Sequence, residues 1–138
     1  MIDIENYTKE VIDLEFLQNI VDRYTQKDVE LVITDDEKIA KINFETRGID
    51  KATDVLSFPL EDFDYTPLGS IVISIDRARE VAKELNHTLD NEIKLLFIHG
   101  FLHLLGFDHE KDSGEMRDEE KKLITELNLP KSLIVRNS

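Results

Sequence analysis

The chain has 138 residues, a length that suits one domain built around a single hydrophobic core. Hydrophobic residues make up 41% of it and charged residues 34%, a balance that excludes a disordered or fibrous protein. The net charge of −13 excludes a general nucleic-acid coat protein, because phosphate binding needs clustered lysine and arginine. It leaves open an enzyme with a local basic cleft.

The cellular compartment is indicated by features that the sequence lacks. It contains no cysteine, so we expect neither disulfides nor thiolate metal ligands. The apolar stretch around Leu95 is too short to span a bilayer. Residues 1–5 have neither the basic start nor the apolar core of a signal peptide. We therefore expect a cytoplasmic protein without a membrane partner.

The first part of the chain predicts a strand, a helix and a second strand. Residues 2–5 form the first strand, and residues 29–34, which alternate and are β-branched, form the second. Between them, apolar side chains recur at helical spacing and predict an amphipathic helix over residues 9–24. Its inward face is expected to carry Val11, Ile12, Leu14, Leu17, Val21 and Tyr24.

A second helix is predicted to follow, because either Asp35 or Asp36 can cap its N-terminus. Gly48 ends this helix and leaves Arg47 near its C-terminus. The side chains expected to face inward are Ile39, Ile42 and Phe44.

Two further strands are predicted after this helix. Residues 53–58 form one strand, which Pro59 stops, and residues 70–75 alternate cleanly as the other. The segment 60–67 between them is acidic and aromatic, and we expect it to be a loop or hairpin connection.

Helices dominate the last third of the chain. Asp76 can cap a helix that runs to about Leu85, and a last helix is expected over residues 113–127 before Pro130. The inward face of this last helix is expected to carry Met116, Leu123, Ile124 and Leu127. The whole pattern predicts an α+β fold over residues 1–138: one domain with a mixed sheet of about four strands, packed by helices.

The central helix of this arrangement carries a candidate metal site. It is capped by Thr88 or Asp90 and ends at Gly106. His99 and His103 are four residues apart, so they project from the same face of the helix. Gly106 permits a positive φ, and the chain can then bring His109 back toward the pair. Three imidazoles leave the fourth position of a tetrahedral zinc ion open, as in catalytic sites.

The alternative is that His99 and His103 are hydrogen-bonded core residues, since pairs at this spacing also occur by chance. Residues 95–106 contain no acidic residue, lysine or arginine, which predicts a buried helix. Burying two imidazoles without partners is costly, and one shared metal ion satisfies both. We therefore favour the metal site. His87 lies outside this segment and is expected to be exposed to solvent.

Three blocks of the sequence resemble the YbeY family of bacterial rRNA maturation endoribonucleases. They are His99-Gly-x-Leu-His103-Leu-Leu-Gly-Phe-Asp108-His109, Asn43-x-x-x-Arg47 followed by Asp50-x-x-Thr53-Asp54-Val-Leu-Ser57-Phe-Pro59, and Leu68-Gly69-x-Ile71-Val-Ile-Ser-Ile. The resemblance implies a zinc-dependent, single-strand endoribonuclease that acts in 16S rRNA maturation and ribosome quality control. The implied partners are single-stranded RNA, rRNA, and the ribosomal small subunit or its associated proteins. By position, His99, His103 and His109 match the zinc ligands, and Arg47 matches an essential arginine.

The residue types agree with cleavage of a phosphodiester. Peptidases of the His-Glu-x-x-His type place a general base after the first histidine, where this chain has Gly100. Zinc can itself lower the pKa of water and polarise a phosphoryl oxygen, and the guanidinium of Arg47 suits the developing charge. Asp108 is expected to orient a histidine or the turn next to it. Asp54 and Ser57 are expected on a strand beside the metal.

Two other functions remain open at the level of sequence. A metallopeptidase would need a carboxylate from elsewhere in the chain to reach the metal-bound water. A ribosome-associated protein without catalytic activity would hold its zinc in a closed site with four ligands. Nickel is an alternative ion, because three imidazoles serve either metal.

Overall fold

The strands predicted from the sequence form one mixed sheet in the computed structural model, which describes residues 1–61, 63–108 and 110–130. Within these residues the strands are β1 (Ile2–Asn6), β2 (Val29–Thr34), β3 (Val55–Pro59) and β4 (Gly69–Ser74). Their order across the sheet is β1-β2-β4-β3, with β1–β2 and β2–β4 parallel and β3–β4 antiparallel. The predicted α+β class with a mixed sheet is confirmed.

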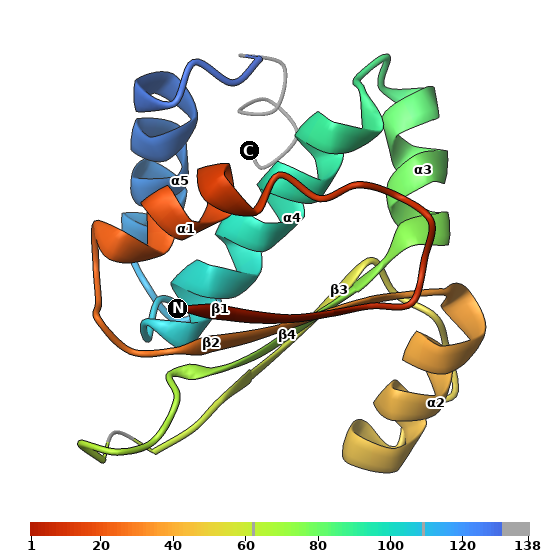
Figure 1. The fold of residues 1–138 in the computed structure, drawn as a ribbon, viewed down its shortest axis with the longest axis horizontal. Coiled ribbons are helices and arrows are strands. Elements are labelled where there is room, and N and C mark those ends of the chain that lie inside the picture. The colour runs from red at the N-terminus through yellow and green to blue at the C-terminus, as the bar shows by residue number, and fades with distance from the viewer. Residues whose placement is uncertain (62, 109, 131–138) are drawn as a thin grey trace.

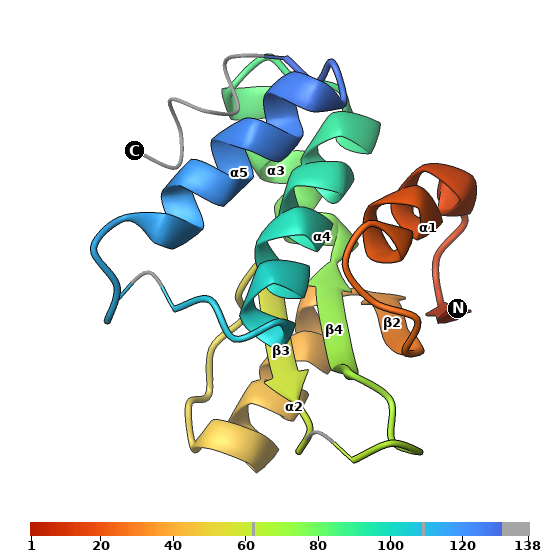
Figure 2. The same ribbon diagram turned by 90° about the vertical axis from the view of Figure 1, so that its left-hand side faces the viewer.

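Helices cover both faces of the sheet (Figure 1). Of the described helices, α2 covers one face, and the other four lie on the opposite face, where α4 runs between α1 and α5 (Figure 2). The helices are α1 (Leu14–Asp22), α2 (Asp36–Arg47), α3 (Ile75–Glu84), α4 (Leu89–Leu104) and α5 (Glu115–Glu126).

Alternation along the central strands divides the apolar side chains between the two faces. Leu31 and Ile33 of β2 and Ile71 of β4 point into the main core, where they have no exposed surface. Val72 of β4 points the other way, into a small cluster with Ile39 of α2. The two-residue period of the strands therefore explains why Leu31, Ile33 and Ile71 hold the large core while Val72 holds α2.

Helix α4 is the buried element that the sequence predicted. Phe97, Ile98 and Phe101 have no exposed surface. Gly100 lets the helix approach the sheet, because a Cβ at this position would lie 3.1 Å from Cγ2 of Ile71 and 3.3 Å from Oγ of Ser57. Within the described parts of the chain, no helix is long and apolar enough to cross a membrane.

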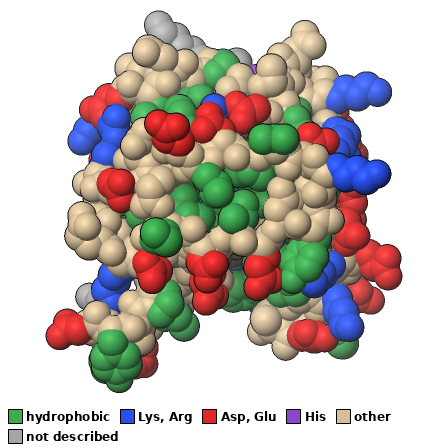
Figure 3. All heavy atoms as spheres, in the orientation of Figure 1, with side chains coloured by type: hydrophobic (Ala, Val, Ile, Leu, Met, Phe, Trp, Pro, Cys, Tyr) green, Lys and Arg blue, Asp and Glu red, His purple; other side chains and the backbone are tan. Residues whose placement is uncertain are grey.

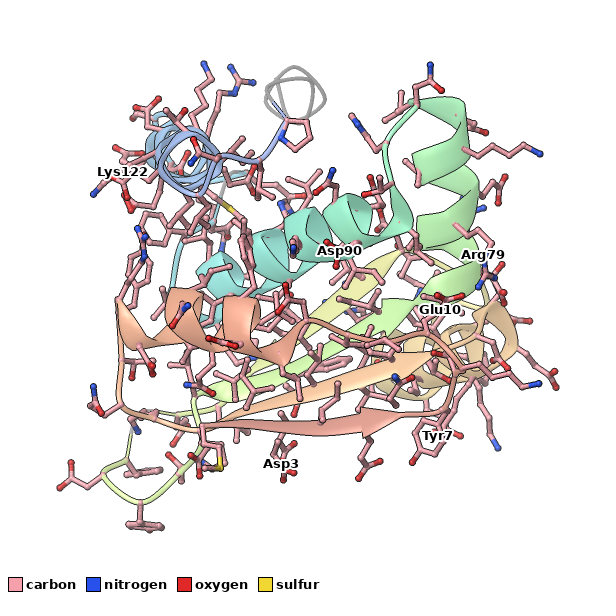
Figure 4. All side chains as sticks on the ribbon, turned by 45° about the horizontal axis from the view of Figure 1, so that its top comes forward. Asp3, Tyr7, Glu10, Arg79, Asp90 and Lys122 are labelled. Carbon is pink, nitrogen blue, oxygen red and sulfur yellow. The ribbon has the colours of Figure 1, made fainter. Side chains whose placement is uncertain are left out.

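The predicted start of the first helix is wrong. Helix α1 begins at Leu14, and its N-cap is Asp13, whose carboxylate accepts a hydrogen bond from the Phe16 backbone N–H. The chain before it is irregular, and Val11, expected inside, is 92% exposed. Arg79 of α3 and Glu10 of this segment lie side by side and form an ion pair of 2.8 Å (Figure 4). The polar contacts of Glu10 and Asp13 thus decide where the helix begins, although the apolar residues before Leu14 have helical spacing.

The predicted inward position of Phe44 is also wrong, since this side chain is 57% exposed. The buried residues of α2 are Ile39 and Asn43, which are four apart and share one face. Phe44 is five residues after Ile39 and therefore points to a different side of the helix. Gly48 ends α2 as predicted, with a φ of 73°.

Several predicted ends of elements differ by one or two residues. Ser74, not Asp76, caps α3, because its hydroxyl accepts a hydrogen bond from the Arg77 backbone N–H. Thr88 caps α4. Helix α5 begins at 115 instead of 113, strand β3 covers 55–59 instead of 53–58, and strand β4 covers 69–74 instead of 70–75. Pro59 is tolerated inside β3 because β3 is an edge strand.

Candidate metal centre and cleft

The last turns of α4 bring His99 and His103 together as their spacing predicted. Their ring centroids are 4.8 Å apart, and the two Nε2 atoms face each other at 3.3 Å. Both side chains are half-buried. The apolar packing of α4 fixes the helix beneath them, so the pair is held in place by the core.

Each imidazole is oriented through its other nitrogen. Nδ1 of His99 lies 2.7 Å from Oε1 of Glu120, and Nδ1 of His103 lies 3.0 Å from the carbonyl oxygen of Phe107. A carbonyl oxygen and a carboxylate accept hydrogen bonds, so we assign the proton of each ring to Nδ1. In the neutral rings, both Nε2 atoms then carry lone pairs that point at one another.

Two facing Nε2 atoms at 3.3 Å need a cation between them, which is either a proton shared in an N–H···N hydrogen bond or a metal ion. A tetrahedral zinc ion with Zn–N bonds of about 2.0–2.1 Å separates its ligand nitrogens by about 3.3–3.4 Å. The spacing of the two Nε2 atoms therefore fits two ligands of one such ion. The support at Nδ1 is the arrangement usual for metal-binding histidines, in which a carboxylate or carbonyl fixes the ring.

The predicted third ligand, His109, lies outside the described residues. Among the residues that the structure does describe, no group of three histidine, cysteine or acidic side chains is arranged to hold a metal ion. The three-histidine site therefore stays a prediction, and the structure gives the geometry of the His99–His103 pair. Gly106 has the positive φ, 102°, that the predicted return of the chain requires.

A cleft of about 510 Å³ opens beside the two histidines. Its wall on the sheet side is the edge strand β3 with the residue before it. Arg47 from α2 also lines the cleft, so helices from opposite faces of the sheet both contribute to it along this edge. The lining residues are Arg47, Asp54, Val55, Ser57, Pro59, His99, His103, Gly106, Phe107, Asp108 and Glu110.

Arg47 is exposed at the last residue of α2, and its guanidinium carbon lies 5.8 Å from the ring centroid of Phe58. One turn earlier, the buried side chain of Asn43 donates a hydrogen bond of 3.0 Å to the carbonyl oxygen of Lys51. This bond ties the helix to the loop that leads into β3. Arg47 is thus a cation at the mouth of the cleft on a braced helix end.

Asp108 lines the cleft and also holds the turn next to it. Its Oδ1 accepts a hydrogen bond of 3.1 Å from the backbone N–H of Glu110, and its carbonyl oxygen accepts from Lys111 and Asp112. The geometry agrees with a role in shaping the turn. Asp54 and Ser57 also line the cleft, as expected from their place on or beside β3.

Sequence reasoning missed Glu120, which is 3% exposed and lies on α5. The signal was present, because Glu120 is four residues after Met116 and four before Ile124, both predicted to face the core. A carboxylate on an apolar face needs a partner. That partner is His99. His87, expected to be exposed, is half-buried.

Comparisons with known proteins show the family and the fold of the chain. Residues 2–128 match the model of the family described as Endoribonuclease YbeY. The chain is 58% identical over 137 residues to the Endoribonuclease YbeY of Nautilia profundicola, with 99% of each chain covered. It is 60% identical over 123 residues to that of Campylobacter jejuni strain RM1221, covering 88% of this chain and 91% of the relative. A Thermotoga maritima protein solved in solution matches with a TM-score of 0.66 at 33% identity, covering 92% of this chain and 89% of that one.

Proposed function

The chain belongs to the YbeY family, and on this premise we propose that it is a metal-dependent endoribonuclease that cleaves single-stranded RNA. The observation that carries the proposal is the His99–His103 pair, whose Nε2 atoms face each other at 3.3 Å beside an open cleft. His109 is the proposed third ligand. Zinc is the proposed ion, with nickel as the alternative.

The bound ion would supply positive charge that polarises a phosphoryl oxygen and lowers the pKa of water. Arg47 would hold the same phosphate from the opposite wall, because its guanidinium is permanently charged and can donate two parallel hydrogen bonds. It would bind more tightly as charge builds on the oxygens in the transition state.

Three carboxylates line the cleft and are candidates for proton transfer, namely Asp54, Asp108 and Glu110. Oδ1 of Asp108 already accepts the backbone N–H of Glu110, which favours a supporting role for that residue. Asp54 directly precedes β3, on the wall that Ser57 shares, and its Oδ1 accepts a hydrogen bond of 3.5 Å from the Thr53 hydroxyl. We propose that one of these cleft carboxylates takes up the proton of the attacking hydroxyl or water.

The proposed substrate is rRNA, with a role in 16S rRNA maturation and ribosome quality control in the cytoplasm. The ribosomal small subunit or its associated proteins are the proposed partners. Carboxylates spread across the face seen in Figure 3, with lysine and arginine side chains toward its margins. Such a surface repels phosphate, so RNA binding would depend on the local cation at the cleft.

The two other functions considered from the sequence have less support. In a peptidase of the His-Glu-x-x-His type a glutamate would replace Gly100, and a Cβ at this position already meets Ile71 and Ser57 at 3.1 and 3.3 Å. A zinc ion that only holds the fold would be enclosed by four side chains. Here the histidine pair borders a cleft of about 510 Å³.

The test is cleavage of a single-stranded RNA by the purified protein, with the metal content measured on the same sample. We expect a chelator and His103→Ala to abolish both bound metal and cleavage. Arg47→Ala should lose cleavage and keep its metal. The matched controls are His87→Ala and Arg77→Ala, which lie outside the cleft and should cleave normally. Full cleavage by metal-free protein or by His103→Ala would refute the proposal.

A further inference from the structure

A second hollow, of about 470 Å³, adjoins the catalytic cleft. Pro59, His103 and Gly106 line both, so the two spaces are adjacent at the histidine pair. Its volume falls within the range of roughly 300–1,000 Å³ that is usual for small-molecule sites. A ligand bound in the cleft would therefore lie next to this hollow.

The walls of the hollow are mainly apolar. Leu104 and Leu105 at the end of α4 form one wall, and Leu60, Pro67 and Leu68 from the β3–β4 connection form the facing one. The segment between α1 and β2 closes the third side with polar groups, namely Tyr24, Thr25 and Lys27. A flat apolar group with polar edges suits such a space.

The hollow is built on packed backbone. The two walls meet closely at Gly69, where a Cβ would lie 2.7 Å from Cδ2 of Leu104. The backbone N–H of Leu60 donates to the carbonyl oxygen of Leu68, and the N–H of Leu68 donates to that of Asp28. These contacts hold the apolar wall to the strands, so the site is largely formed before a ligand arrives.

Lys27 lines the hollow, and its ammonium group contacts backbone carbonyl oxygens of the β3–β4 connection. Nζ of Lys27 lies 2.5 Å from the carbonyl oxygen of Phe63 and 3.2 Å from that of Thr66. It ties the β3–β4 connection to the segment before β2. The hollow thus suits the uncharged part of a nucleotide better than its phosphate, which has Arg47 in the adjoining cleft.

We propose that this hollow binds the base of the nucleotide next to the cleaved phosphate. The inference rests on the proposed endoribonuclease function and adds a binding site to it. A base enclosed in this hollow cannot pair with a complementary strand. The hollow would therefore give a physical reason for cleavage of single strands.

The test uses a short single-stranded RNA in which one abasic nucleotide is placed at each position in turn. At the position beside the cleaved bond, the missing base should raise KM about tenfold with a smaller change in kcat, since each stacked base contributes substantially to binding. Abasic nucleotides elsewhere should have less effect. Uniform tolerance of abasic nucleotides by an enzyme that cleaves the intact RNA would overturn the proposal.

The second arm of the test fills the hollow with a large side chain. Thr25→Trp should raise KM about tenfold on intact RNA, and the abasic nucleotide should then cause no further increase. Thr25→Val controls for the lost hydrogen bond from the Lys27 backbone N–H to the Thr25 hydroxyl, and Thr125→Trp on the exposed face of α5 controls for the added tryptophan. Unchanged kinetics of a folded Thr25→Trp would overturn the proposal and leave the hollow to another ligand, such as a peptide.

Failure of the proposed function gives a different result. In that case the wild-type protein cleaves none of the RNAs. Fluorescence anisotropy of labelled RNA then decides the binding question without cleavage. A tenfold weaker Kd for one abasic RNA supports the base site, and equal values for all of the RNAs, or no binding, overturn it. If Thr25→Trp does not fold, the abasic series in the wild-type protein still gives the answer.

Discussion

Glu120 is predicted to set the affinity of the metal site without touching the metal. Its side chain is buried, and its Oε1 lies 2.7 Å from Nδ1 of His99. This contact fixes the ring with Nε2 toward His103 and makes the imidazole a better donor. Glu120→Ala removes it and leaves the ring free to turn.

The expected loss is 10- to 100-fold in metal affinity, or about 1.4–2.7 kcal/mol, the usual cost of removing such a partner. Glu120→Gln should fall between the alanine variant and the wild type, because an amide oxygen still accepts from Nδ1 but carries no charge. Both changes should be measured by competition with a chelator of known affinity.

The matched control is Glu119→Gln. Its carboxylate accepts a hydrogen bond of 2.7 Å from the Tyr24 hydroxyl, whereas the carboxylate that meets His99 is that of Glu120. The control variant should bind metal as the wild type does. If Glu120→Ala binds metal with wild-type affinity, the carboxylate does not orient His99, and the reasoning from the Nδ1 partners fails.

Three further predictions follow from the packing and charges. Gly100→Glu should lower the free energy of unfolding by about 3 kcal/mol or more, because its side chain would enter the packed space beside Ile71. Urea unfolding measures this change. A variant that unfolds at the same urea concentration as the wild type would contradict the prediction. Burial, with the hydrogen bond to Glu119, raises the pKa of Tyr24 above its usual value of 10.0. The unfolded chain then loses this proton first, so stability should fall as the pH rises above about 10, and Tyr24→Phe should flatten the fall; an equal slope in both proteins would refute it. Arg47→Lys should lower kcat well below the wild type with its metal retained, because an ammonium cannot make the two-pronged contact; unchanged kcat would exclude that contact.

The strands and the buried helix could be predicted from the sequence because their signals are local. Alternation along β2 and β4 separates Leu31 and Ile71 from Val72 correctly. The spacing of His99 and His103 predicts a shared face, and the structure brings the two rings together. These patterns depend on residues at most four apart, so tertiary contacts need not be known.

The misplaced residues depend on information that is not local. Val11 has the right spacing for a helix, but Asp13 caps α1 after it and Glu10 pairs with α3. Phe44 has an apolar side chain on a helix that covers only a small cluster, so part of that helix faces solvent. Local hydrophobicity cannot show how much of a helix surface its partner covers.

The sequence patterns predict only part of the cleft. It joins Arg47, β3 and the end of α4, which are brought together by the strand order β1-β2-β4-β3. The family resemblance gave the residues, but not their separation or the hollow beside them. Glu120 could have been found, because a carboxylate on the apolar face of α5 has to meet a partner.

The central claim is that the facing Nε2 atoms of His99 and His103 hold one metal ion. Anomalous diffraction at the zinc edge, from crystals grown with zinc, tests it directly. The account predicts one peak per chain within bonding distance of both Nε2 atoms, with at least one coordination position left to solvent. A peak elsewhere, the absence of a peak, or an ion enclosed by four protein ligands would contradict it.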